Sequence, residues 1–274
     1  MIGQLIRLLL AASMAAVFVS CSVKEDRTGC PCWLELDISG CTQAEDVTIG
    51  TISGETAFME KVRPQDCSGI YAKEVKKGML SLYSFSVAGD MSCKGKILTI
   101  PAGKDCAAIW AMKDNFPCEQ ETISRKLKLH KQFTDVKITF RGSEDQSLSS
   151  EIGDVTVKNG YKYVVESDIN GIDMEELKPY PGIFMKELIF DDWHSSSVRL
   201  PRHKVDSNLK IRVYEHGNEV EVLPLDNWIR KTGFDWTAED LGDVEVGIDY
   251  AKSQIEITVN DWEKGNSDEI IFEL

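Results

Sequence analysis

The chain has 274 residues, of which 42% are hydrophobic and 28% charged, a balance typical of globular proteins rather than of disordered or fibrous ones. Its length fits two domains of about 100–150 residues each, although one large β domain is also allowed. With a formal net charge of −14, the chain repels nucleic acid and anionic lipid head groups, so neither is an expected partner.

The first 20 residues have the pattern of a secretory signal peptide. Arg7 precedes an uncharged, apolar run over 8–19, which is shorter than the roughly 20 residues needed to cross a bilayer. The run leads directly to Cys21, where lipoprotein maturation requires a cysteine. We therefore predict a signal peptide over 1–20 and a membrane anchor of diacylglycerol and N-acyl lipid on Cys21. The alternative is an ordinary secretory signal with a chance cysteine, and Phe18 departs from the leucine usual at that position.

A polar, aperiodic segment over 21–29 is expected to be a lipidated tether, and a cysteine-rich half of the chain follows it. In an oxidising compartment, seven cysteines beside Cys21 would allow up to three disulfides and one leftover thiol, with the pairing left open by the sequence. A zinc knuckle is disfavoured, because the first two are separated by one residue only. The seven are Cys30, Cys32, Cys41, Cys67, Cys93, Cys106 and Cys118.

Beyond the tether, apolar and polar side chains alternate, which is typical of half-buried antiparallel strands. Two short helices are expected, one over 225–231 that ends at Gly233 and one that begins at Thr237, with Asp240 in a partial capping box. The fold class predicted is all-β, mostly antiparallel, as two tandem β-sandwiches. The alternating segments are 34–38, 136–140, 161–165, 209–213, 220–222, 244–250, 255–259 and 270–274.

Proline and glycine near the middle of the chain place the predicted domain boundary. Pro179, Pro181 and Gly182 interrupt the alternation. We therefore predict an N-terminal β-sandwich domain over 30–180 and a C-terminal one over 181–274.

Motifs for catalysis or for metal and cofactor binding find little support. The segment 192–195 has the residue types of a catalytic triad, but a solvated loop is the better interpretation. The segment 168–175 resembles a calcium loop, yet its glycine is misplaced, so a strand exit or hairpin is favoured. We expect a protein that is not an enzyme and has no cofactor, metal or small-molecule substrate.

Two features of the second half bear on binding. Trp228, Trp236 and Trp262 would form a sugar-stacking platform if exposed, although burial in the core is favoured. The chain ends on an alternating strand with Ile270, Phe272 and Leu274 on one face. Such a strand usually completes its own sheet, but it is also a candidate to pair with another subunit.

Short motifs follow one another along the chain: E-D-R at 25–27, C-P at 30–31, L-E-L-D at 34–37, I-P-A-G at 100–103, I-W at 109–110, T-G-F-D-W at 232–236, I-D-Y at 248–250 and V-N-D-W-E at 259–263. In order and spacing they resemble the fimbrial anchoring subunits (fimbrillin-associated anchor lipoproteins) of type V pili. The resemblance covers essentially the whole mature chain. The high cysteine content is the departure from that family.

The resemblance implies two tandem transthyretin-like β-sandwiches and lipidation of Cys21. It also implies a non-catalytic role at the cell surface: to anchor a fimbrium to the outer membrane, to limit its length and to contact a pilin-like stalk subunit. We take this as the expected function, with strand pairing as the mode of contact. A surface-exposed glycan-binding lipoprotein is the alternative.

Overall fold

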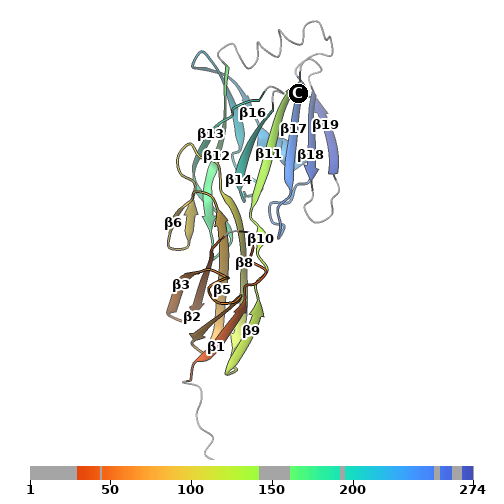
Figure 1. Ribbon diagram of the computed structural model, residues 1–274. Helices are drawn as coiled ribbons and strands as arrows, with labels where there is room; N and C mark the ends of the chain where they lie inside the picture. Colours follow the sequence, from red (N-terminus) through yellow and green to blue (C-terminus); the bar gives the residue numbers. More distant parts are fainter. Residues whose placement is uncertain are drawn as a thin grey trace, which may run out of the picture.

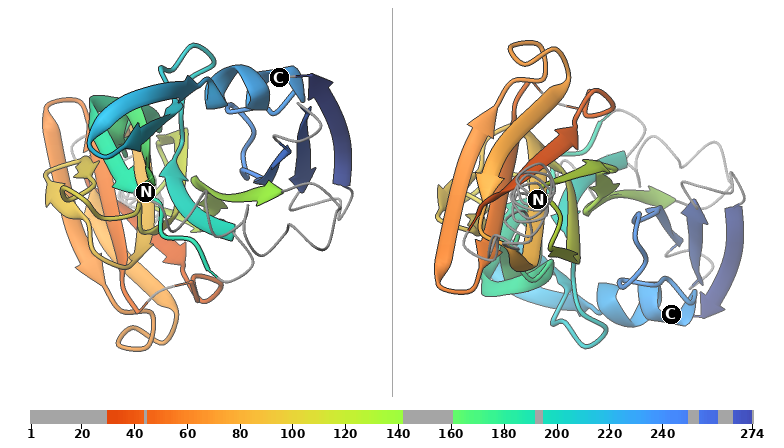
Figure 2. Two further views of the ribbon diagram at one scale, coloured as in Figure 1. Left: turned by 90° about the horizontal axis from the view of Figure 1, so that it is seen from above. Right: turned by 90° about the horizontal axis from the view of Figure 1, so that it is seen from below.

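The computed structural model describes residues 30–43, 45–141, 161–191, 195–249, 254–260 and 267–273. Within these ranges the chain folds into two β-sandwiches placed end to end, as predicted for an all-β protein (Figure 1). In the views along the long axis, part of the second sandwich overlies the first, and its last strands, coloured blue, lie to one side (Figure 2). The predicted Cys21 and its tether lie outside the described residues.

The first sandwich packs a three-stranded sheet against a five-stranded one. Its core is built from alternate residues of the facing strands, such as Leu34 and Leu36 from one sheet and Leu80 and Leu82 from the other. In sheet order the strands are β4 (Ile70–Val75), β1 (Cys32–Asp37) and β9 (Thr122–Lys126), and then β10 (His130–Lys131), β8 (Ala108–Cys118), β5 (Gly78–Ala88), β2 (Val47–Ser53) and β3 (Thr56–Val62).

The second sandwich also has two sheets, and its core is continuous with side chains of β5 and β8. One sheet has the order β14 (Ser195–Pro201), β11 (Phe133–Arg141), β17 (Asp243–Asp249), β18 (Gln254–Asn260) and β19 (Ser267–Glu273). The other has β16 (Asn218–Leu223), β15 (Lys210–Glu215), β12 (Tyr161–Asp173), β7 (Ile97–Thr99) and β6 (Ser92–Lys94), with β13 (Lys178–Glu187) paired to β12.

Strand pairing does not follow the boundary predicted between 180 and 181. That position lies inside β13, where Pro181 is paired with Ile169 of β12. The sheets that hold 181–274 also contain β11, β12 and the β6–β7 hairpin. After that hairpin the chain returns to the first sandwich, and it leaves this sandwich for the last time at Gln132, between β10 and β11. The prolines are tolerated because β13 is an edge strand, where a missing N–H costs no ladder hydrogen bond.

The predicted helix over 225–231 is confirmed as α3 (Leu225–Lys231). Gly233 follows its end with a φ of +77°, the left-handed conformation that glycine adopts without strain. The second helix, predicted from Thr237, is absent from the described structure, where that segment forms turns and bends. Asp235 accepts hydrogen bonds from both the N–H and the hydroxyl of Thr237, while Asp240 accepts one from the N–H of Lys131 at 2.6 Å and so serves a different segment.

Gly171 permits the close approach by which the β6–β7 hairpin joins the second sandwich. It is paired with Thr99, and a Cβ there would lie 2.0 Å from the backbone oxygen of Leu98. We expect Gly171→Ala to push β7 off β12 and to lower the free energy of unfolding by about 2 kcal/mol. Urea denaturation followed by circular dichroism measures this. The matched change Gly40→Ala, with nothing within 4 Å of the added Cβ, should leave stability nearly unchanged, and equal effects of the two changes would contradict the packing argument.

Candidate functional site

The predicted partner strand is β19, and in this structure it pairs with β18. Ile270 lies opposite Ile257, and Phe272 opposite Ile255. Because β19 is the last strand of its sheet, its outer backbone edge has no strand beside it within the described residues. The strand therefore completes its own sheet here, and pairing with another subunit stays a prediction. Leu274 lies outside the described residues.

Another open sheet edge, that of β13, was missed by the sequence analysis. The strand β13 pairs with β12 along one side, and no strand of the described ranges pairs with its other side. We call it the β13 edge and define it by Ile183 and Met185, whose side chains are 77% and 46% exposed. Ile189, just beyond the strand, is 81% exposed. Apolar side chains on an open strand edge are typical of a surface that pairs with another chain.

An ion-pair network lies next to the β13 edge. Glu166 of β12 is opposite Met185, and its carboxylate accepts hydrogen bonds from the guanidinium of Arg212, at 2.5 Å, and lies 3.1 Å from Nζ of Lys210. These partners, Arg212 foremost, hold the pKa of Glu166 below its usual value. Arg212, which lies on β15, also contacts Glu219 of the neighbouring strand β16. The outer face of this sheet is thus charged along β12 and β15, and apolar at the β13 edge.

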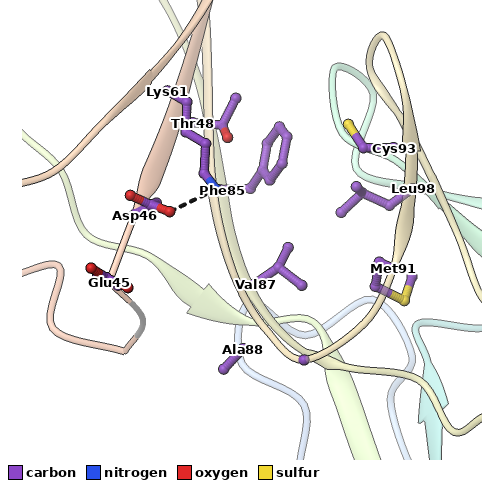
Figure 3. Close-up of a pocket in the computed structure, with 11 residues that line it drawn as sticks. Glu45, Asp46, Thr48, Lys61, Phe85, Val87, Ala88, Met91, Cys93 and Leu98 are labelled. Atoms are coloured by element: carbon purple, nitrogen blue, oxygen red, sulfur yellow. Dashed lines mark ion pairs between the residues drawn. The ribbon is translucent and has the colours of Figure 1, made fainter.

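A pocket of about 490 Å³ lies between β2, β5 and the β6–β7 hairpin (Figure 3). The carboxylate of Asp46 lies 2.6 Å from Nζ of Lys61 and 3.2 Å from Nε of Arg63, and the hydrogen bond from Lys61 is the main cause that lowers its pKa. Glu45, the other acid at the rim, lies 3.6 Å from Arg63. The charges of this pocket are therefore committed to ion pairs, beside an apolar wall of Phe85, Val87, Met91 and Leu98.

The tryptophans proposed as a sugar platform lie in the core where the structure describes them. Trp228 and Trp236 are each only 6% exposed. The ring of Trp236 packs edge-on against Phe234, with centroids 4.7 Å apart, and lies 5.1 Å from the ring of His203. Trp262 lies outside the described residues. Two of the three rings are therefore unavailable for stacking on a sugar.

The other segments singled out by sequence have structural roles or lie outside the described ranges. The calcium-like segment 168–175 is the end of β12 and its turn, in which Asp173 accepts a hydrogen bond from the N–H of Glu175. Positions 192–194 of the triad-like segment lie outside the described residues. Within the described ranges, no three acidic, cysteine or histidine side chains gather as metal ligands would, and no helix has the length and apolarity to span a bilayer.

None of the seven described cysteines is part of a disulfide. Cys32, Cys41, Cys106 and Cys118 are buried, and Cys30 and Cys93 are exposed. The disulfides predicted from the sequence, up to three, are therefore not seen in this structure.

Comparison with known proteins finds likeness in fold alone. No family model matches the sequence, and no curated protein matches it. Among solved structures, a provisionally assigned polysaccharide-binding protein from Bacteroides thetaiotaomicron superposes with a TM-score of 0.61 at 13% identity, covering 89% of this chain and 98% of the other.

Two further structures share the fold. A provisionally assigned adhesin from Bacteroides ovatus has a TM-score of 0.56 at 12% identity, covering 85% of this chain and 94% of the other. The fimbrial anchor protein Mfa2 from Porphyromonas gingivalis has a TM-score of 0.55 at 9% identity, covering 87% of this chain and 99% of the other. The likeness therefore extends over both sandwiches, and at these identities it establishes the architecture.

Proposed function

We propose that this protein is a lipid-anchored subunit of the outer membrane that holds a fimbrium on the cell and limits its length. The main support for this proposal is the arrangement of two sandwiches in tandem after the lipidation signal expected at Cys21. A fimbrial anchor protein of known structure has the same architecture over nearly its whole length, and the motif order of the sequence independently resembles that family.

Contact with a stalk subunit is assigned to strand pairing at an open sheet edge. Two open edges support this, β19 and the β13 edge, because each leaves backbone hydrogen-bonding groups without a strand partner within the described residues. Backbone pairing would supply affinity, and alternate side chains would supply specificity. The acidic chain gives no attraction to anionic head groups, so attachment to the membrane falls to the lipid.

A glycan-binding lipoprotein is the weaker candidate. One structural neighbour is named for polysaccharide binding, but burial of Trp228 and Trp236 removes most of the aromatic platform that motivated this function.

The anchoring role is tested by Cys21→Ser in a strain that lacks the chromosomal gene. The matched control is Cys30→Ser, which changes an exposed cysteine just beyond the tether. We expect the control to co-sediment with outer membranes, to co-purify with a pilin-like stalk subunit and to restore attached fimbriae of normal length. Cys21→Ser should leave the membrane fraction and shed its fimbriae into the medium. Attached fimbriae of normal length in the Cys21→Ser strain, or in the deletion strain itself, would contradict the proposal.

A further inference from the structure

Two buried cysteines meet at one end of the first sandwich, from its two facing sheets. Cys32 begins β1 and is paired with the last residue of β4. Cys118 ends β8 and is paired with the first residue of β5. The chain after Cys118 returns to β1, where the N–H of Trp33 donates to the carbonyl of Glu121 at 2.8 Å. Two of the crossovers between the sheets, β4 to β5 and β8 to β9, therefore lie at this end and place Cys32 near Cys118.

The two thiols are neighbours inside the core. Their side chains have no exposed surface and belong to one apolar cluster. Burial, and after it the neighbouring Cys32, raises the pKa of Cys118 to about 11. Because the thiolate is the reactive form, the closed sandwich protects this pair from redox reagents.

We propose that Cys32 and Cys118 form a disulfide that joins the two sheets of the first sandwich in the exported protein. The bond forms while the sandwich is still open. One thiolate attacks the disulfide of an oxidant, either an exported thiol–disulfide oxidoreductase or oxidised glutathione, and displaces one sulfur as a thiolate. The second cysteine then attacks the mixed disulfide and displaces the other sulfur. The cysteines together lose two electrons and two protons, and the oxidant becomes two thiols.

The position of this bond gives it a mechanical role, which rests on the proposed anchoring function. A pull on the fimbrium would reach the lipid through the tether, and the tether enters the fold immediately before β1. In the dithiol form β1 is held by hydrogen bonds to β4 and β9 and by its apolar side chains. A bond from Cys32 to Cys118 would tie the loaded strand to the five-stranded sheet, so that β1 could not be peeled away alone.

The bond is tested on the full mature chain carrying Cys21→Ser and Cys30→Ser, refolded from the reduced state in a mixture of reduced and oxidised glutathione. After blocking of free thiols, digestion with trypsin and a glutamate-specific protease separates Cys32 from Cys41. We expect a linked peptide pair, 28–35 with 114–119, which disappears on reduction. Recovery of Cys118 with a blocked free thiol, or linked to a cysteine other than Cys32, would overturn the proposal.

A second measurement, of the melting temperature, compares the oxidised and reduced forms of each variant. The oxidised protein should melt about 10 °C above the reduced protein, because the bond closes a long loop in the unfolded chain. Cys118→Ala should abolish this difference, whereas Cys41→Ala, at another buried cysteine, should retain it. A redox-dependent melting point that persists in Cys118→Ala would also overturn the proposal. The protein tested carries no lipid, so this result does not depend on whether Cys21 anchors a fimbrium.

Discussion

Replacing Arg202 by methionine is expected to lower the free energy of unfolding by about 4 kcal/mol, the largest effect of any single substitution considered. The side chain is buried, with its residue only 7% exposed. Its guanidinium donates to Oε1 of Gln132 at 2.8 Å, to the carbonyl of Ala238 at 2.7 Å and to the carbonyl of Trp236. Methionine fills a similar volume but leaves these acceptors without donors, at a cost of about 1–3 kcal/mol for each one that stays buried.

The location of Arg202 explains why this cost is not relieved by local movement. Gln132 is the residue between β10 and β11 at which the chain passes for the last time from the first sandwich to the second, and its N–H donates to the carbonyl of Ile109. Arg202 thus ties the 236–239 segment of the second sandwich to the connection between the two. Burial lowers the pKa of Arg202, which stays charged at neutral pH because its reference value is so high.

Urea denaturation of Arg202→Met measures the effect, and Arg199→Met is the matched control three residues earlier. Arg199 forms a two-point contact with Asp135, at 2.7 and 3.0 Å, in a partly exposed position. The loss there should be about 1 kcal/mol, because water can solvate the remaining carboxylate. If the two substitutions destabilise the protein equally, burial of the Arg202 network is not the source of the effect.

Local patterns predicted the strands with regular alternation and the helix with a glycine stop. The segments around Val136, Ile211 and Ile257 all form strands, since one face of each is buried and the other is solvated. The fold class follows from these segments, because period-two patterns separated by short turns admit few alternatives to stacked antiparallel sheets.

Features that depend on pairing between distant segments were not predictable from sequence. The prolines of β13 resemble a linker until the strand is seen at a sheet edge, where Pro181 needs no hydrogen-bonded N–H. The helix expected at Thr237 is replaced by turns, because Asp235 binds the backbone locally and Asp240 binds Lys131 instead. Likewise, the proximity of Cys32 and Cys118 depends on two crossovers meeting at one end of a sandwich.

Lowering the pH from 6.5 to 4 is expected to remove roughly 3 kcal/mol of stability through His203 alone. This imidazole is buried, and its Nδ1 lies 2.6 Å from the carbonyl of Pro201, to which it donates. Nε2 lies 2.8 Å from Oγ of Ser167 and accepts the hydroxyl proton. Burial lowers the pKa of His203 to about 4, against smaller opposing contributions from Pro201 and Asp168.

The sign follows from proton binding in the two states. Between pH 6.5 and 4 the unfolded chain protonates this histidine while the folded protein does not, so protons favour unfolding and stability falls as the pH falls. The span of about 2.5 pH units, at 1.36 kcal/mol per unit, sets the magnitude. Carboxylates held in ion pairs lose their stabilising effect at lower pH, and they do so in every variant alike.

A pair of histidine variants isolates this contribution. Unfolding free energies of the wild type and His203→Gln, measured in urea at intervals from pH 7 to pH 4, should converge as the pH falls, because glutamine does not titrate. His216→Gln, at an exposed turn, should keep the pH dependence of the wild type, since this change leaves the buried imidazole of His203 in place. Parallel curves for His203→Gln and the wild type would mean that the folded and unfolded proteins bind this proton over the same pH range, which would contradict the lowered pKa of His203.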